Sequence, residues 1–342
     1  MPKIGFFHQG ALGDFILFMP VLDGIAEIQS SVSFELWTRP SYGCLFYGKL
    51  YRLGIHPYDA EFWRAFFLDN SWKDVPIPEN LALCDTFFWV GQEGSREVVE
   101  RLQKKLPFPV RWIQSFPARK SGKPVTQFLA DQFTLLGWDV EDTRPSVRVD
   151  PEAEKDVAGW LEAKGIRRRK FMTVHIGSGG ISKVWPLGRW QGFLSYIFEC
   201  SGRPVVLLSG PADGPFEPFV SWVSGRYDWP VVRGFTLERL AALLRLSEMY
   251  VGCDSGVSHL AGAVGVPAMV IVRQNGTKIW APRGKNVNIY QDQWHNEEVL
   301  CWDTDRDAVF APSLRRKFDD LIGQRAFAFL RDSIRGVEKS FS

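Results

Sequence analysis

The chain has 342 residues, of which 45% are hydrophobic, and its formal net charge at pH 7 is +2. This length suggests two domains, and the apolar content is sufficient for two hydrophobic cores. The nearly balanced charge differs from the strongly basic surface of a nucleic-acid-binding domain, so we expect no nucleic-acid partner.

The five cysteines are spread along the chain and form no C-x-x-C pair. This spacing favours reduced thiols over a disulfide framework or a zinc site. Met1 is followed almost directly by a short strand, without a secretory apolar region, and no apolar run approaches the ~20 residues that a spanning helix needs. We therefore expect a cytoplasmic protein.

In the first half of the chain, alternating apolar patterns predict strands over residues 3–8, 32–38, 85–90 and 110–116. Helices are expected over 15–28 and over 126–136, the second ended by Gly137. Aromatic residues cluster at 62–67 and at 87–89. Core packing is the favoured interpretation of both clusters, and a sugar-stacking or lipid-facing surface is the alternative.

In the second half, strands are predicted over residues 171–176, 204–209, 231–233, 249–254 and 268–272. Helices alternate with them, one over 187–199 and another starting at the N-cap candidate Thr236. This alternation indicates parallel α/β sheets. A final amphipathic helix is predicted within 313–335, and the expected domains are 1–150 and 151–311, followed by a C-terminal segment, 312–342.

Three strand-to-helix turns carry the polar residues of greatest interest. They contain Gly13-Asp14, the stretch 177–183 and Asp254-Ser255-Gly256. Each follows the carboxyl end of a predicted strand, which is where open α/β sheets bind ligands. In the third turn Asp254 or Ser255 is expected to cap a helix whose first amides and dipole would hold a phosphate. An ordinary strand-to-helix junction is the alternative, and no turn matches G-x-G-x-x-G or a Walker A loop.

Together these turns resemble the motifs of glycosyltransferase family 9, the bacterial heptosyltransferases of lipopolysaccharide synthesis. Gly13-Asp14 matches the family's first motif. The pattern H-x-G-S-G … K-x-W-P is matched by His175, Gly177, Ser178, Gly179, Lys183, Trp185 and Pro186. The pattern D-[ST]-G-x-x-H-x-A-A is matched by Asp254, Ser255, Gly256, His259 and Ala261, with Gly262 replacing an alanine. The chain departs from the family at 274–278, where a G-P-T-[DN]-P turn is usual.

The resemblance implies an α/β fold of the GT-B type, with two Rossmann-like domains facing a central cleft. It implies inverting transfer of a sugar, heptose from ADP-heptose, to a lipopolysaccharide core or related glycan acceptor, free or lipid-linked. No metal and no cofactor besides the nucleotide-sugar donor are expected. In such folds the last helix crosses back to the first domain.

Asp14 matches the family's catalytic aspartate, so the resemblance implies that it is the general base. The alternative is a helix N-cap, in which backbone amides would lower the pKa of the carboxyl group and its basicity. Lys183 is expected to clamp the donor diphosphate, with a hydroxyl from Ser178 and close backbone approach at Gly179. A solvated surface charge is the alternative for Lys183.

Asp254 is expected to accept sugar hydroxyls or to cap the helix, while the amides of Ser255 and Gly256 bind phosphate. His259 would donate to a phosphate or serve as a structural histidine. Ser209 and Gly210 form either a nucleotide-side loop or a plain turn.

Asp303-Thr304-Asp305 resembles a metal-binding D-x-D motif, but it lies near the C-terminus and not after a central strand, so we discount it. The basic run 167–170 is a solvated loop or a contact with anionic membrane headgroups at the inner face of the cytoplasmic membrane. A nucleotide-sugar-binding scaffold without transferase activity is the alternative function. An NAD-dependent oxidoreductase is disfavoured because no strand is followed by a dinucleotide fingerprint.

Overall fold

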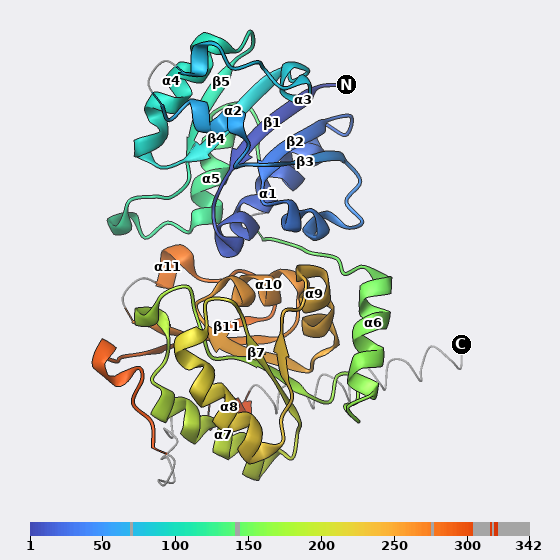
Figure 1. The fold of residues 1–342 in the computed structure, drawn as a ribbon, viewed down its shortest axis with the longest axis vertical. Coiled ribbons are helices and arrows are strands. Elements are labelled where there is room, and N and C mark those ends of the chain that lie inside the picture. Colours follow the sequence, from blue (N-terminus) through green and yellow to red (C-terminus); the bar gives the residue numbers. More distant parts are fainter. Residues whose placement is uncertain (69–70, 141–143, 275–276, 304–314, 317, 321–342) are drawn as a thin grey trace. The chain divides into compact units, whose positions relative to one another are not determined.

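The computed structural model describes residues 1–68, 71–140, 144–274, 277–303, 315–316 and 318–320. Within these residues the strands form two sheets, drawn in Figure 1, with the orders β3-β2-β1-β4-β5 and β11-β10-β9-β6-β7-β8. All neighbouring strands are parallel. The predicted α/β fold with two parallel sheets is confirmed.

The strands of the first sheet are β1 (Lys3–His8), β2 (Ser33–Thr38), β3 (Arg52–Pro57), β4 (Thr86–Gly91) and β5 (Val110–Gln114). Those of the second are β6 (Met172–His175), β7 (Val205–Ser209), β8 (Val231–Arg233), β9 (Met249–Cys253), β10 (Ala268–Arg273) and β11 (Val287–Asp292). Each predicted strand is present, whereas β3 and β11, one at an edge of each sheet, were not predicted.

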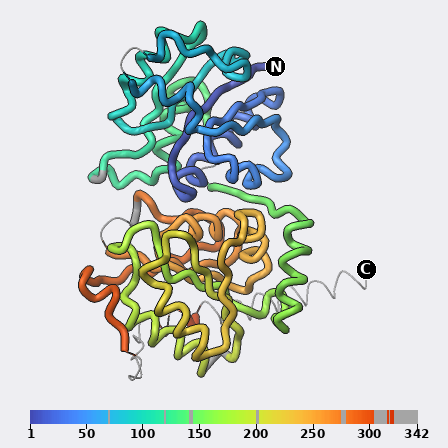
Figure 2. The backbone as a smooth tube through the Cα atoms, viewed as in Figure 1, coloured from blue at the N-terminus to red at the C-terminus, as the bar shows by residue number. Residues whose placement is uncertain are grey.

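The helices can be followed along the chain in Figure 2. They are α1 (Leu12–Ile28), α2 (Glu61–Ala65), α3 (Glu79–Ala82), α4 (Arg96–Lys105), α5 (Val125–Thr134), α6 (Pro151–Glu162), α7 (Leu187–Ser201), α8 (Glu217–Tyr227), α9 (Leu237–Leu246), α10 (Gly256–Val264) and α11 (Thr277–Trp280). Thr236 caps α9, as predicted, by accepting the Arg239 amide. Asp150 caps α6, a helix that was not predicted, by accepting the Glu152 amide.

Each sheet has one position where the strand order reverses direction. In the first sheet β1 lies between β2 and β4, and in the second β6 lies between β7 and β9. The loops that leave such neighbouring strands turn to opposite faces of the sheet, which opens a crevice at the carboxyl ends of the strands. The turns after β1, β6 and β9 all lie at these reversal points.

The hydrophobic core accounts for most of the aromatic residues. Phe6 on β1 packs against Phe18, Phe34 and Phe88, with ring centroids 5.2–5.8 Å apart. The predicted aromatic clusters are also buried, with the exception of Phe67, which is 54% exposed. Core packing is therefore confirmed for nearly all of these residues.

The chain divides into two compact units: residues 1–184 with 204–293, and residues 185–203 with 294–342. The first unit holds both sheets. In the second, Trp190 and Phe193 on α7 pack edge to face with Trp185 and Phe318, respectively.

Most of the predicted helix at 313–335 lies outside the described residues, and the predicted domain boundaries stay predictions. No helix among the described residues is both long and apolar enough to span a bilayer.

Candidate functional site

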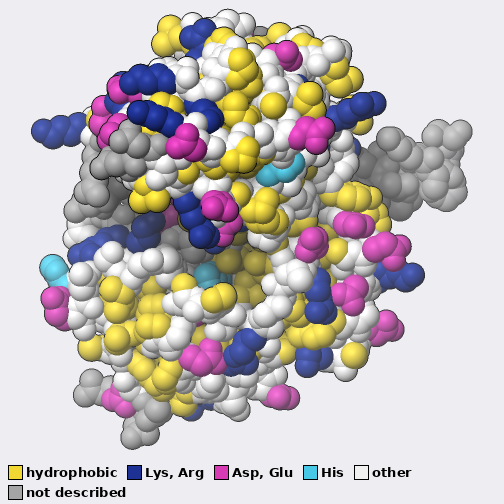
Figure 3. Space-filling model, turned by 45° about the horizontal axis from the view of Figure 1, so that its top comes forward, with side chains coloured by type: hydrophobic (Ala, Val, Ile, Leu, Met, Phe, Trp, Pro, Cys, Tyr) yellow, Lys and Arg dark blue, Asp and Glu magenta, His cyan; other side chains and the backbone are white. Residues whose placement is uncertain are grey.

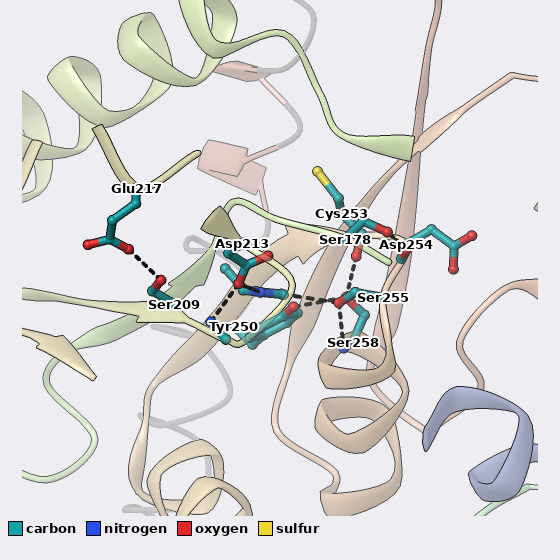
Figure 4. A network of polar contacts seen from close by, with 11 residues as sticks. Ser178, Ser209, Asp213, Glu217, Tyr250, Cys253, Asp254, Ser255 and Ser258 are labelled. Atoms are coloured by element: carbon teal, nitrogen blue, oxygen red, sulfur yellow. Dashed lines mark hydrogen bonds and ion pairs between the residues drawn. The ribbon is translucent and has the colours of Figure 1, made fainter. Parts of the chain in front are cut away.

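The turns that follow β6 and β9 lie side by side. β6 and β9 are paired neighbours, with His175 opposite Gly252, so their carboxyl ends deliver both turns to one point. The Ser178 hydroxyl, labelled in Figure 4, donates to the backbone carbonyl of Asp254 at 2.5 Å. The Lys183 ammonium lies 2.9 Å from Asp254 Oδ2. These two contacts join the predicted second and third motifs.

Ser255 is the N-cap of α10: its hydroxyl oxygen accepts the Ser258 amide at 3.4 Å. The alternative in which Asp254 caps the helix is therefore wrong, because the Asp254 carboxylate faces Lys183 instead. Burial alone would raise the pKa of Asp254. A hydrogen bond from His259 and the nearby Lys183 charge outweigh it and hold this pKa below its usual value. Asp254 is thus a carboxylate at neutral pH.

His259 is buried on the first turns of α10, with its Nε2 atom 3.8 Å from Asp254 Oδ1. Its ring also lies against α1, because a Cβ atom added to Gly13 would come within 2.8 Å of His259 Cδ2. Gly256 contacts α1 in the same way, and its added Cβ would lie 3.0 Å from Leu12 Cβ. The two glycines allow the N-termini of α1 and α10 to touch.

Asp14 occupies the third position of α1, and its carboxylate accepts the Ala11 amide at 3.2 Å. The N-cap position itself belongs to Ala11, so Asp14 is not the N-cap residue. Burial raises the pKa of Asp14, and the Ala11 amide, His259 and Lys183 offset only part of that rise. The backbone contact thus lowers the pKa of Asp14, as the N-cap alternative expected, but burial outweighs it and the net shift is upward.

Two groups beside Asp14 were missed by sequence reasoning. His8 ends β1, and its Nδ1 accepts the Gly10 amide at 3.3 Å while its ring packs against Phe18. Burial lowers the pKa of His8 to about 4, so it is neutral at pH 7. The Tyr42 hydroxyl donates to the Gly10 carbonyl at 3.4 Å. The position of His8 directly before the glycine turn was the available signal.

Ser209 and Gly210 both form hydrogen bonds with other residues of the protein. The Ser209 hydroxyl donates to Glu217 at 2.7 Å, and the Gly210 amide donates to Asp213 at 2.6 Å. The Asp213 carboxylate, buried to 3% exposure, also contacts Nε2 of His175 at 2.9 Å. His175 belongs to the second motif and Asp213 to the loop after β7, but sequence reasoning gave neither residue a role of its own.

The glycines of the second motif serve different purposes. A Cβ on Gly177 would lie 1.7 Å from Asp213 Oδ1, so glycine is required there by the protein's own packing. A Cβ on Gly179 would meet no described atom within 4 Å. The same holds for the adjacent Gly180, so both glycines leave open space beside the backbone, which fits the predicted close approach of a ligand at Gly179.

The predicted basic run lies at the amino ends of the strands of the second sheet. Arg167, Arg168, Arg169 and Lys170 are exposed and precede β6, whereas the candidate site follows the carboxyl ends of the strands. Positive and negative side chains are interspersed over the face shown in Figure 3. A membrane contact through this run would be separate from the site.

Among the described residues, no group of three or more His, Cys, Asp and Glu side chains could hold a metal ion. Of the discounted D-x-D stretch, Thr304 and Asp305 lie outside the described residues. Lys183 and the first turn of α10, with its helix dipole, favour an anion beside the Asp14 carboxyl.

Two parallel sheets with polar turns at both reversal points define an α/β protein of the GT-B class. The chain belongs to glycosyltransferase family 9 (heptosyltransferase), whose family model matches residues 123–303. This match covers just over half of the chain, including the second and third motifs.

A curated relative, lipopolysaccharide heptosyltransferase 3 of Escherichia coli, is 22% identical over 204 residues. The match covers 56% of this chain, which spans about half (54%) of that relative's length. A family 9 glycosyltransferase from Veillonella parvula is similar in structure, with a TM-score of 0.71 and 15% identity over 94% of this chain and 98% of that one. ADP-heptose LPS heptosyltransferase II of E. coli has a TM-score of 0.68 and 14% identity over 95% and 100%. At these identities the structures establish the fold.

Proposed function

We propose that this protein is an inverting, metal-independent glycosyltransferase that moves heptose from ADP-heptose to a lipopolysaccharide core or related glycan acceptor. The observation that carries the proposal is the contact between Gly13 and His259. It brings the base candidate Asp14 together with the cationic turn formed by Lys183 and the start of α10.

Lys183 and the first amides of α10 would hold the donor diphosphate. As the bond between the sugar and the diphosphate breaks, negative charge accumulates on the departing ADP, and preorganised cations and amides stabilise it. The Lys183 side chain is 54% exposed, so it is free to turn from Asp254 toward a bound anion. Asp254 would accept hydroxyl groups of the sugar.

Asp14 would act as the general base. The acceptor hydroxyl attacks the anomeric carbon, Asp14 takes its proton, and ADP leaves from the opposite face with the bonding electron pair. The sugar passes through an oxocarbenium-like transition state. A raised pKa suits this role, because a general base works best when its pKa is closer to the operating pH.

The names of the relatives support the donor and acceptor classes. One is a lipopolysaccharide heptosyltransferase and another carries ADP-heptose in its name. The location we propose is the cytoplasm, where dispersed cysteines stay reduced. A peripheral contact at the inner face of the membrane would use the exposed basic run 167–170.

Thermal unfolding with ADP, GDP, UDP, CMP and NAD tests the donor class. A ligand at ~100 times its dissociation constant stabilises a protein by ~2.7 kcal/mol, and we expect this for ADP. Release of ADP from ADP-heptose with a glycan acceptor then tests transfer. No stabilisation by any nucleoside diphosphate, or stabilisation by NAD alone, would contradict the proposal. Binding without turnover would favour the scaffold alternative.

A further inference from the structure

A buried chain of hydrogen bonds crosses three neighbouring strands at the carboxyl edge of the second sheet. Asp213 follows β7, His175 ends β6, and Ser255 follows β9. His175 Nε2 lies 2.9 Å from Asp213 Oδ2, and His175 Nδ1 lies 3.2 Å from the Ser255 hydroxyl. Figure 4 shows Asp213 and Ser255 within this network.

Each oxygen of the Asp213 carboxylate has identified neighbours in the protein. One carboxylate oxygen accepts both from His175 and from the Gly210 amide at 2.6 Å. The other oxygen lies only 1.7 Å from the position that a Cβ atom on residue 177 would take. Glycine at position 177 therefore makes room for it. Burial alone would raise the pKa of Asp213, but the contacts with His175 and Gly210 lower it, so the group stays ionised.

The ionised Asp213 carboxylate fixes which ring nitrogen of His175 faces it with a proton. An ionised carboxylate only accepts hydrogen bonds, so His175 must carry a proton on Nε2. The other ring nitrogen, Nδ1, then faces the Ser255 hydroxyl. The lone pairs of Ser255 Oγ remain for the Ser258 amide, which is the N-cap contact of α10.

The first turn of α10 is also held from its other side. The Ser258 hydroxyl donates to the Cys253 carbonyl at 2.5 Å and lies 2.9 Å from the Tyr250 hydroxyl. Ser258 and Tyr250 are fully buried. The Ser255 hydroxyl also lies 3.4 Å from the Ser258 hydroxyl, and His175 is the residue that links this cap to Asp213.

The geometry points to Asp213 as a positioning residue that acts through His175 and Ser255 to aim the first amides of α10 at the donor diphosphate. This inference rests on the proposed function, which assigns those amides to the diphosphate. Asp213 itself does not touch the ligand, because its carboxylate is enclosed by Gly177, Gly210 and His175. Loss of its charge frees the histidine ring to change tautomer, and the cap loses its fixed geometry.

The test is calorimetric binding of ADP, inorganic pyrophosphate and adenosine to wild type and Asp213→Asn. Asparagine is nearly isosteric and keeps one acceptor, so the fold is retained. We expect ADP and pyrophosphate to bind about tenfold or more weakly, the equivalent of ~1.4 kcal/mol, and adenosine within about twofold. Ser247→Ala is the matched control: this buried hydroxyl donates to the Leu244 carbonyl near the amino end of β9.

A double-mutant cycle distinguishes positioning of the Ser255 cap by Asp213 from a general loosening of the structure around Asp213. If Asp213 acts through Ser255, then Asp213→Asn adds little to Ser255→Ala, whereas independent effects multiply. Multiplying effects, or unchanged ADP and pyrophosphate affinity in Asp213→Asn, would overturn the positioning role alone. Failure of wild type to bind any nucleoside diphosphate would overturn the proposed function and this inference together.

The protonation state of His175 can also be tested on the wild-type protein. Nitrogen-15 histidine correlations distinguish the protonation states of the two ring nitrogens. We expect His175 to carry a proton on Nε2. A neutral ring protonated on Nδ1 would contradict the hydrogen bond to Asp213 and overturn the inference.

Discussion

Lys183 and Asp254 form an ion pair, 2.9 Å from Nζ to Oδ2, across the reversal point between β6 and β9. The lysine is 54% exposed and the aspartate 19%. A pair that is partly in solvent contributes at most about 1 kcal/mol, so separating it costs little. The pair therefore holds Lys183 beside the start of α10 without preventing its transfer to a stronger anion.

Replacing Lys183 separates diphosphate binding from nucleoside binding. Lys183→Met should weaken ADP about tenfold or more, since a charge-assisted contact contributes roughly 1.5–3 kcal/mol, and should leave adenosine nearly unchanged. Titration calorimetry measures both. Lys123→Met is the control, because Lys123 is a comparably exposed lysine paired with Asp131 in the other half of the chain. Equal losses for ADP and adenosine would contradict the clamp.

Asp14→Asn should leave ADP affinity intact and reduce turnover at least ~100-fold, the usual contribution of a general base. Because the pKa of Asp14 is raised, the acid limb of kcat/KM should lie above ~3.9, the ordinary aspartate value. Steady-state rates between pH 4 and 8 measure both effects. Near-normal turnover of the variant would remove Asp14 from the mechanism.

The same substitution has an expected effect on stability. A carboxyl group with a raised pKa in the folded state contributes stability only at low pH, and this contribution is lost as pH rises through the raised value. At pH 7 the ionised Asp14 thus destabilises the fold. Asp14→Asn should raise the free energy of unfolding by about 0.5–2 kcal/mol at pH 7. The gain should shrink toward pH 4, and a variant less stable than wild type at pH 7 would contradict this account.

Two glycine substitutions should affect different properties, one the stability of the fold and the other the affinity for ADP. In Gly13→Ala the new Cβ lies 2.8 Å from the buried His259 ring, and such overpacking costs about 1–3 kcal/mol. In Gly179→Ala the methyl group meets no described atom, so the stability should stay within about 0.5 kcal/mol of wild type. We expect ADP affinity to fall in Gly179→Ala nonetheless, because the methyl group occupies space beside the ligand. Thermal unfolding and calorimetry separate the two effects, and unchanged ADP affinity in Gly179→Ala would contradict the close approach of the ligand at Gly179.

Most of the fold could be predicted because buried parallel strands are strongly apolar. The edge strands β3 and β11 were missed because they are only partly buried. β3 contains Gly54 in its interior and ends at Pro57, and both residue types are depleted in strands. Its pairing with β2 supplies the stability that the local sequence lacks.

The candidate site was predictable as a set of turns but not as a set of contacts. Motif spacing places Lys183 and Asp254 in ligand turns, yet 71 positions separate them, and only the pairing of β6 with β9 brings them together. Asp213 gave no local signal, since a single aspartate after a glycine turn is common. Its importance arises from three strands that meet in space.

His8 should make stability depend on pH between about 4 and 6.5. Burial lowers its folded-state pKa to about 4, whereas an unfolded histidine titrates near 6.5. In this interval the unfolded chain binds a proton that the folded chain does not. Stability is therefore fully present above pH 6.5 and is lost as pH falls, by about 3 kcal/mol over the interval.

His8→Phe keeps a ring against Phe15 and Phe18 but has no titrating group. Urea unfolding at pH 7, 6, 5 and 4 should show a shallower loss of stability in the variant than in wild type. The difference should approach ~1.4 kcal/mol per pH unit within the interval. His295→Gln, at an exposed histidine, is the control and should follow wild type. Parallel curves for wild type and His8→Phe would mean that His8 does not remain neutral in the folded protein.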